Sequence, residues 1–272
     1  MEATTTVIRP RTGWNGLGLA ELWRARELVL FFAWRQVLVR YKQTVLGVAW
    51  SVLQPLSLMA VMLVVITLAK RGGNHGAVWI LAGIVPWQFF ATAVSQSAGS
   101  LVGQIPLLTK IYFPRLIPPV ASVIAALVDM AISFSLLLAV MAIFHDQVHV
   151  QPLALALLPL LALLAFVTAL GIGLWLSALN VAYRDVQYLV PFLIQIGMFA
   201  SVLFPASITS GTWYTVLGLN PMAGVVEGFR YAIVGGNSPS NLVVLSSVIS
   251  LSLLVSGLAY FKRAERTFVD VI

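Results

Sequence analysis

The junction between a basic segment and the first long apolar run constrains this chain more than any other feature. Arg35, Arg40 and Lys42 lie just before an uncharged run from Gln43 to Ala69. A helix of about 20 residues, rising 1.5 Å per residue, crosses the hydrocarbon core of a bilayer, so this run is long enough to span. Lys and Arg before a first span hold that end in the cytoplasm. The junction therefore predicts where the first membrane helix begins and which way it points.

Composition agrees with a membrane-embedded chain. Of the 272 residues, 60% are hydrophobic and only 9% are charged, whereas a soluble domain carries about 25% charged residues. The net charge of +7 does not indicate nucleic-acid binding, because the basic residues lie at the ends of apolar runs, where they set topology. The absence of cysteine excludes a disulfide framework and cysteine metal sites. The fold class predicted is an all-α polytopic membrane protein.

Six apolar segments are predicted to span the membrane. They lie near residues 44–69, 77–103, 116–144, 153–179, 187–204 and 242–261. An even number of spans places both termini on one side, and the positive-inside rule places that side in the cytoplasm. With this orientation, only Lys70, Arg71 and Arg230 among the basic residues fall outside. Residues 1–42 then form a cytoplasmic tail and a helix before the membrane, and residues 43–272 form the six-span domain.

The helix before the membrane is predicted over residues 18–42. Its apolar residues follow an imperfect helical stripe that includes Trp23, Leu30, Trp34 and Leu38. An amphipathic helix of this kind lies in the headgroup plane. It is either an interface helix that also supports a cytoplasmic partner or a simple anchor on the membrane surface.

The outer segment over residues 205–240 contains two apolar pieces, 213–219 and 222–234. Each is shorter than the roughly 18 residues needed to span, and such pieces are typical of re-entrant or interfacial helices. Asn220 is a candidate N-cap, Pro221 suits the first helical turn, and two glycines follow Val234. We therefore expect two short re-entrant helices between spans five and six, forming a pore mouth.

No catalytic motif is present. The chain lacks a GxxxxGK[ST] phosphate-binding loop, an HExxH motif and a GxSxG motif. Its three histidines fall in predicted outer loops and do not cluster with carboxylates, so no metal site is expected. The chain is predicted to be no enzyme and to bind no cofactor itself.

Asp129 lies near the middle of the predicted third span. A charge at the centre of a membrane helix costs about 2.5–3.5 kcal/mol on insertion scales, so this carboxylate needs a partner or a wet cavity. It is either a proton relay or substrate contact, or a hydrogen-bonded carboxyl at a helix interface.

Glu227 and Arg230 are three residues apart on the second outer piece and therefore share a helix face. Their position in an apolar, partly buried helix favours a structural or gating role over a plain surface pair. We expect Asn220, Pro221, Glu227 and Arg230 to belong to an outer gate.

Two sets of residues are candidates for a polar path. Tyr188, Phe192, Gln195 and Phe199 share one side of span five, and aromatic faces with an amide between them suit sugar rings. The same stripe also fits ordinary helix packing. Gln88 and Thr92 lie on one face of span two, above Gly99 and Gly103, whose GxxxG spacing predicts a close helix approach.

Two inner loops are candidates for docking a partner. The loop IPLLTKIYFPR is short and bounded by prolines, and its apolar residues alternate with Lys110 and Arg115. An exposed apolar patch rimmed by charge usually binds another protein. The loop after span four places Arg184 and Asp185 on the same side.

These pieces in order resemble the permease subunits of ABC-2 type polysaccharide exporters. The resemblance is carried by RYKQTVLGVAW with LQP, TKIYFPR, LNVAYRDVQY and NPMAGVVEGFRYAI, and covers nearly the whole chain. It is closest to the exporters of O-antigen, the side chain of lipopolysaccharide. Capsule and teichoic-acid exporters share much of the pattern.

The resemblance implies a homodimer in the bacterial inner membrane with two separate ATPase subunits, which bind ATP and Mg. The dimer would conduct an undecaprenyl-pyrophosphate-linked polysaccharide. The ATPase would contact the coupling helix through Ile105, Leu108, Lys110, Tyr112 and Arg115, together with Arg184 and Asp185. Arg35, Arg40 or Lys42 could pair with the lipid pyrophosphate. Residues 221–234 would be a periplasmic gate helix.

Other functions compete with this interpretation. An ABC-2 exporter of drugs or small lipids would favour an aliphatic cavity, which Gln88 and Gln195 argue against. A membrane glycosyltransferase would need clustered carboxylates or arginines at the outer face, where only Asp146, Glu227 and Arg230 lie.

Overall fold

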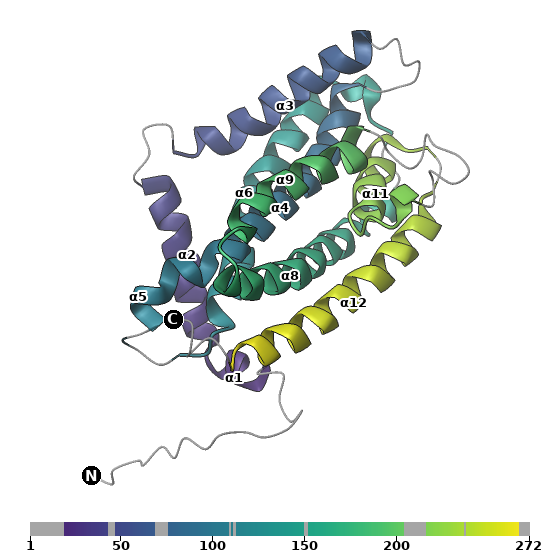
Figure 1. Ribbon diagram of the computed structural model, residues 1–272. Helices are drawn as coiled ribbons and strands as arrows, with labels where there is room; N and C mark the ends of the chain where they lie inside the picture. The colour runs from purple at the N-terminus through teal and green to yellow at the C-terminus, as the bar shows by residue number, and fades with distance from the viewer. Residues whose placement is uncertain are drawn as a thin grey trace.

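The computed structural model describes residues 19–42, 47–68, 76–108, 110, 113–149, 152–203, 216–236 and 238–266. These residues form helices and connecting turns and contain no strand (Figure 1). The α-helices are α1 (Leu19–Arg24), α2 (Arg26–Lys42), α3 (Ala49–Leu68), α4 (Ala77–Ser100), α5 (Ile105–Leu108), α6 (Ile117–Ile143), α7 (Pro152–Leu155), α8 (Leu158–Ala182), α9 (Val186–Met198), α11 (Ala223–Val234) and α12 (Ser240–Ala264). Short 3-10 turns η1 (Val102–Gln104) and η2 (His145–Gln147) follow α4 and α6, and a π-helical turn η3 (Phe199–Leu203) continues α9.

Six of these described segments are long and apolar enough to cross a membrane: α3, α4, α6, α8, α9 with η3, and α12. The six predicted spans are therefore confirmed, with shifts of a few residues at their ends. The start of span four shifts by five residues, to Leu158 from near residue 153. Pro159 lies in the first turn of α8, and a proline has no N–H to continue a helix from the preceding turn. The residues before it form the separate turn α7.

The predicted continuous helix over residues 18–42 is two helices, α1 and α2, with a break at Ala25. The first span also starts later than expected, at Ala49. Gly47 has a φ of 45°, a left-handed conformation that interrupts helical geometry and is accessible to glycine without strain. The chain therefore turns between α2 and α3 instead of passing directly from one into the other.

Helix α4 is the centre of the bundle, with 78% of its spanning window buried. It packs against α3, α6, α8, α9 and α11. By contrast, only 11% of the α3 window and 17% of the α9 window are buried. Figure 1 shows α3 along the outside of the bundle, with α9 beside α4. Two of the spans therefore present most of their apolar surface outward.

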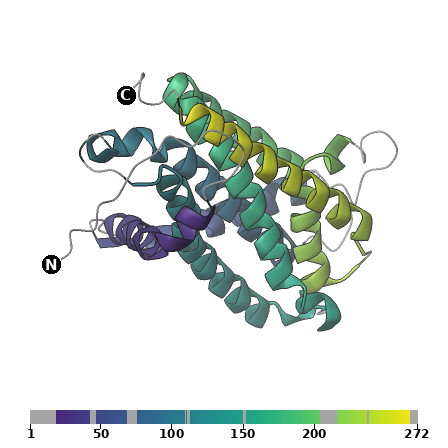
Figure 2. The same cartoon turned by 90° about the horizontal axis from the view of Figure 1, so that it is seen from below.

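Helices α8 and α12 lie side by side in both views (Figures 1 and 2). Lipid tails are as apolar as the helix surfaces, so association in a membrane depends on small residues and on polar contacts between helices. Here a Cβ on Gly171 would lie 2.7 Å from the backbone nitrogen of Leu254, which shows how closely the backbones approach. Thr168 and Ser250 place their hydroxyls 2.6 Å apart across the same interface. Glycine at position 171 therefore permits this packing.

The expected close approach at Gly99 and Gly103 is wrong for the described residues. A Cβ on either glycine would meet no heavy atom within 4 Å. The glycine spacing alone does not determine a contact, because the neighbouring helix must also lie on that face.

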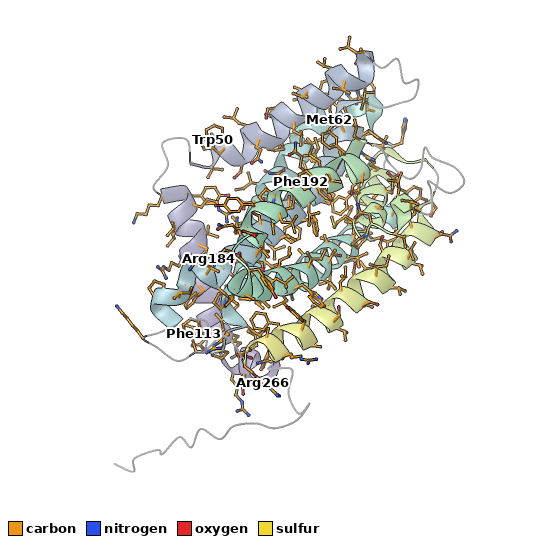
Figure 3. All side chains as sticks on the ribbon, viewed as in Figure 1. Trp50, Met62, Phe113, Arg184, Phe192 and Arg266 are labelled. Atoms are coloured by element: carbon orange, nitrogen blue, oxygen red, sulfur yellow. The ribbon has the colours of Figure 1, made fainter. Side chains whose placement is uncertain are left out.

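The elements predicted to be cytoplasmic gather at one end of the bundle. Figure 3 shows Phe113, Arg184 and Arg266 near that end, close to α1, α2 and α5, while α11 lies at the other end (Figure 1). At the opposite end, the backbone N–H of His149 donates to the carbonyl of Ile233 over 3.1 Å. This bond ties the connection after α6 to the end of α11. The two ends therefore carry the elements assigned to them by the positive-inside rule.

Candidate functional site

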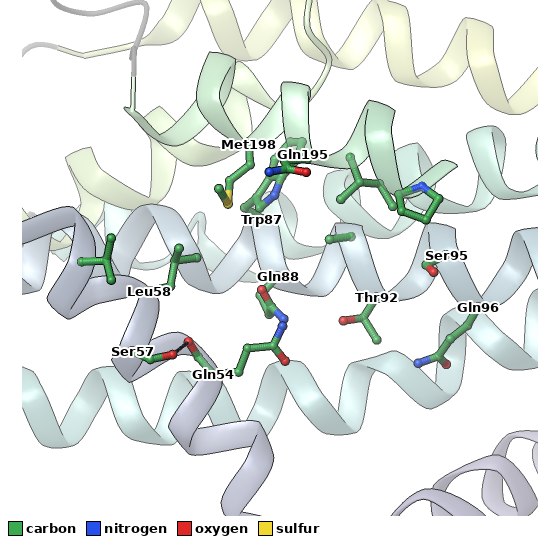
Figure 4. Close-up of a pocket in the computed structure, with 14 residues that line it drawn as sticks. Gln54, Ser57, Leu58, Trp87, Gln88, Thr92, Ser95, Gln96, Gln195 and Met198 are labelled. Carbon is green, nitrogen blue, oxygen red and sulfur yellow. Dashed lines mark hydrogen bonds between the residues drawn. The ribbon is translucent and has the colours of Figure 1, made fainter. Parts of the chain in front are cut away.

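A cavity of about 680 Å³ with both polar and apolar side chains in its wall lies between α3, α4 and α9 (Figure 4). Its polar lining consists of amide and hydroxyl side chains from all three helices: Gln54, Ser57, Gln88, Thr92, Ser95, Gln96 and Gln195. Apolar side chains such as Leu58, Trp87 and Met198 complete the wall. Polar side chains within membrane spans either join helices by hydrogen bonds or face a water-filled cavity, and these seven line a cavity. We take this cavity as the candidate functional site.

The structure brings together three of the six residues expected to line a channel. Gln88 and Thr92 from α4 and Gln195 from α9 all line the cavity. Tyr188, Phe192 and Phe199 are exposed by 75%, 59% and 41% and do not line it. These aromatic residues share the α9 face of Gln195, but α9 has few neighbours in the single chain. Their lining role remains a prediction.

Sequence reasoning missed several lining residues, chiefly Gln54, Trp87 and Gln96. The available signal was an amide within an otherwise apolar span, which applies to Gln54 and Gln96 as it does to Gln88. The buried side-chain oxygen Oε1 of Gln96 has no hydrogen-bond partner among the described residues. A buried amide oxygen without a partner is unfavourable, so this group can accept a hydrogen bond from a ligand.

At the outer end, Glu227 and Arg230 form a buried ion pair. Their exposed fractions are 7% and 2%, and Arg230 Nη1 donates to Glu227 Oε1 over 2.9 Å. Arg230 Nη2 also donates to the carbonyl of Val202 in η3 over 2.8 Å, and its guanidinium lies over the Trp79 ring of α4. Arg230 therefore joins α11 to α4 and to the end of span five. A Cβ on Gly83 would come within 2.7 Å of Arg230 Nη2, so glycine makes room for the guanidinium.

The short segment before α11 is also tied to span five. The Asn220 side chain donates from Nδ2 to Ser201 Oγ over 2.6 Å and accepts from the Met222 backbone N–H over 3.0 Å. Pro221 lies in the turn before α11 rather than at its first helical position, since the helix begins at Ala223. Of the predicted first outer helix, residues 213–219, the structure describes 216–219, and residues 216–218 form a single helical turn. The four expected gate residues thus lie around one outer helix that is buried against the bundle.

Asp129 of α6 pairs with Arg40 at the end of α2. The Tyr41 hydroxyl donates to the same carboxylate, and the hydroxyls of Tyr41 and Ser51 lie 2.9 Å apart. Three elements, α2, α3 and α6, therefore meet at one carboxylate. Of the two interpretations of Asp129, this arrangement supports a paired carboxyl at a helix interface.

The Arg40–Asp129 pair also shows how α2 is placed along α6. Its buried face, with Val29, Phe32 and Val37, packs along the inner half of α6. At 1.5 Å per residue, Asp129 is about 18 Å along α6 from its start, so the end of α2 lies well away from the inner end of that helix. Arg40 is engaged with Asp129, whereas Arg35 and Lys42 are exposed.

The loop expected to dock a partner is only partly exposed. Phe113 is buried, with its ring centroid 5.4 Å from that of Phe32, because α2 covers this part of the loop. The expectation of an exposed phenylalanine is therefore wrong. Arg115 Nη1 donates to the backbone carbonyl of Glu265 over 2.7 Å, which ties the loop to the end of α12.

The other residues predicted for this docking surface fall into two groups: some are exposed, and others lie outside the described residues. Lys110, Arg184 and Asp185 are exposed at this end, and Ile105 begins the short helix α5. The backbone of Leu108 ends α5, but its side chain and the whole of Tyr112 lie outside the described residues.

No group of three or more metal-ligating side chains exists among the described residues. Together with six candidate spans and a cavity lined by neutral polar groups, these features define a polytopic membrane protein with a polar path among its helices.

Comparison with known proteins identifies the family. The sequence model of the ABC-2 type transporter family matches residues 27–234, which include α2 to α11. The chain therefore belongs to the ABC-2 type transporter family. It is 26% identical to the O-antigen export system permease protein RfbA of Myxococcus xanthus, over 93% of this chain and 98% of that protein. It is 22% identical to the protein of the same name from Klebsiella pneumoniae, over 90% of this chain and 95% of that protein.

Proposed function

We propose that this chain is the permease subunit of an exporter that moves a lipid-linked polysaccharide, O-antigen, across the bacterial inner membrane. The observation that carries the proposal is the neutral, amide-lined cavity between α3, α4 and α9. Hydroxyl-rich sugars need hydrogen-bond partners in an apolar membrane, and amides both donate and accept. The names of the related permeases support the same substrate class.

The permease functions as a homodimer that carries an undecaprenyl-pyrophosphate-linked glycan. The outward-facing apolar surfaces of α3 and α9 support this assembly, because these two spans are the least buried of the six in the single chain. The cavity lies between these helices and α4, so a second copy placed there would extend the polar path.

Both termini lie in the cytoplasm, and a separate ATPase subunit binds there with its ATP and Mg. Its docking surface is formed by α5 with the exposed Lys110, Arg184 and Asp185. Arg115 supports this surface by anchoring the loop to α12. Arg35 and Lys42 are the exposed cations that are positioned to meet the lipid pyrophosphate, and Arg40 fixes the helix that carries them.

The outer helix α11 is the gate. Its attachment to α4 and η3 through Arg230 supports this role, because a rearrangement of these polar contacts would couple a movement of α11 to the ends of two spans.

The test is a purification of the tagged chain in mild detergent from its own host, with partners identified by mass spectrometry. We expect a P-loop ATPase in about equal amount, which is lost in the double variant Lys110→Glu, Arg184→Glu. Asp146→Lys, a charge change at the exposed opposite end, is the matched control and should retain the ATPase. A chain that purifies without any ATPase would overturn the proposal.

A further inference from the structure

The three helices that line the cavity carry no side chain of Asp, Glu, Lys, Arg or His. This holds for Ala49–Leu68, for Ala77–Ser100 and for Val186–Leu203. Every polar group on the cavity wall is therefore neutral: an amide, a hydroxyl or the indole N–H of Trp87, as Figure 4 shows for the labelled glutamines, serines and threonine. This is a stronger restriction than a polar lining alone, because the site supplies hydrogen bonds without supplying any counter-charge.

We propose that this cavity binds an uncharged, hydroxyl-rich stretch of glycan and discriminates against glycans that carry a charge on each repeat. The inference rests on the proposed function and specifies its substrate class. It separates neutral polysaccharides from acidic capsules and teichoic acids.

The glutamine side chains of the cavity and the hydroxyls of a sugar match chemically, because both are neutral groups that donate and accept hydrogen bonds. A glutamine side chain offers two N–H donors and one carbonyl acceptor, and a sugar hydroxyl both donates and accepts. Gln54, Gln88 and Gln195 come from three different helices, so a chain in the cavity can be bound from several directions. The unpartnered Gln96 Oε1 adds an acceptor that a hydroxyl can satisfy after a side-chain rotation. The volume of about 680 Å³ is within the range of about 300–1,000 Å³ that holds an organic ligand.

In the proposed dimer, where a second copy covers this cavity, a carboxylate or phosphate on the glycan would exchange much of its water for the cavity wall. Removing water from an ion is unfavourable unless an opposite charge compensates. Two arginines of the bundle are already paired with carboxylates: Arg40 with Asp129, and Arg230 with Glu227. Neither pair lines the cavity. The site therefore disfavours anions by leaving them without a partner, which is how polar sites reject a wrong ligand.

The chain contains no cysteine, so a single introduced thiol reports on one position. Ser95 lines the cavity and is exposed, so Ser95→Cys places a thiol in the wall. The matched control is Ser252→Cys on α12, an exposed serine that does not line the cavity. Both variants are assembled with the ATPase in lipid nanodiscs, and the rate of reaction with a neutral maleimide is measured. The probes are a linear oligomannoside, which is neutral, and an oligogalacturonate of the same length, which is anionic.

We expect the oligomannoside to slow the labelling of Ser95→Cys, by about fourfold at a concentration three times its Kd. The oligogalacturonate should leave that rate unchanged, and neither probe should affect Ser252→Cys. Equal protection by both probes, stronger protection by the anionic probe, or protection by neither would overturn the inference.

A second variant tests the role of charge directly. Adding Gln88→Lys to Ser95→Cys introduces one cation into the wall, and the oligogalacturonate should then protect the thiol. If the added lysine gives no protection by the anionic probe, the lack of counter-charge is not the basis of discrimination, and the inference is wrong. Failure of either experiment leaves the co-purifying ATPase in place, whereas failure of the exporter proposal removes it.

Discussion

The guanidinium carbon of Arg230 lies 3.5 Å from the centroid of the Trp79 ring. Arg230 belongs to the outer helix α11, and Trp79 belongs to the first turn of α4, the most buried span. A cation over the face of a tryptophan is stabilised by the ring quadrupole, more so when water is excluded. The same guanidinium holds Glu227 and the Val202 carbonyl. A single side chain thus connects three elements at the outer end.

Replacing Arg230 with leucine should destabilise the protein strongly. The change leaves Glu227 buried without its partner, and breaking a buried pair in this way costs about 3–5 kcal/mol. The thermal unfolding midpoint of the purified protein measures the effect. Glu227→Leu added to Arg230→Leu should recover much of the loss, because no unpaired charge then remains. Lys262→Ala is the control, since its pair with Glu265 is more exposed and such pairs contribute about 0–1 kcal/mol. An unchanged midpoint in Arg230→Leu would contradict the buried pair.

Removing the Asp129 carboxylate should loosen α2. In Asp129→Ala, Arg40 and Tyr41 lose their shared acceptor, so hydrogen exchange at the backbone amides of residues 26–42 should increase. Exchange measured by mass spectrometry reports this directly. Ser135→Ala is the matched control, because this α6 hydroxyl donates only within its own helix.

Exchanging the two charges separates pairing from other roles of Arg40. In the double variant Arg40→Asp, Asp129→Arg, the protection of α2 should return. Undiminished protection in the single variant Asp129→Ala would instead show that apolar packing alone fixes the helix.

Adding one methyl group at Gly171 should separate α8 from α12. The new Cβ would lie 2.7–3.0 Å from backbone atoms of Leu253 and Leu254, which cannot move independently. Overpacking of this kind costs about 1–3 kcal/mol, which the thermal midpoint detects. Gly99→Ala provides the comparison, because its Cβ meets nothing within 4 Å and alanine is the better helix former. Equal losses in the two variants would argue against the close approach of α8 and α12.

The orientation of the chain can be tested with single thiols, since the sequence has no cysteine. Asp146→Cys, on the exposed η2 turn, should react with a membrane-impermeant maleimide in intact spheroplasts. Lys110→Cys should react only after the membrane is opened. The reverse pattern would place the termini outside and remove the proposed docking surface for the ATPase.

The spans were predictable because each is a long apolar run, and apolar length is what a bilayer selects. Their ends shifted where backbone chemistry intervened, at Gly47 and at Pro159. Of the cavity, Gln88, Thr92 and Gln195 were predicted from amides and hydroxyls in apolar helices. Gln54 and Gln96 carry the same signal and were missed.

Partners distant in the sequence were not predictable. The family resemblance implied that Arg35, Arg40 or Lys42 could pair with the lipid pyrophosphate, yet Arg40 meets Asp129, 89 residues later. The link from Arg230 to Trp79 spans 151 residues. Local spacing identified Glu227 as a neighbour of Arg230, but no local pattern encodes which helix lies against that face. The GxxxG spacing at Gly99 failed for the same reason.

The pairing of Arg40 with Asp129 has a consequence for the order of assembly during synthesis. The ribosome produces α2 before it produces any span, but the carboxylate that holds the end of α2 arrives only with α6. Until then Arg40 has no acceptor at that position, and the nascent helix has only part of its final attachment. When the third span inserts, Asp129 pairs with Arg40 and is no longer an uncompensated charge in the membrane. The same pair fixes the position of α2 along α6. Helix α2, which leaves the ribosome before any span, therefore completes its docking only after the third span is in place.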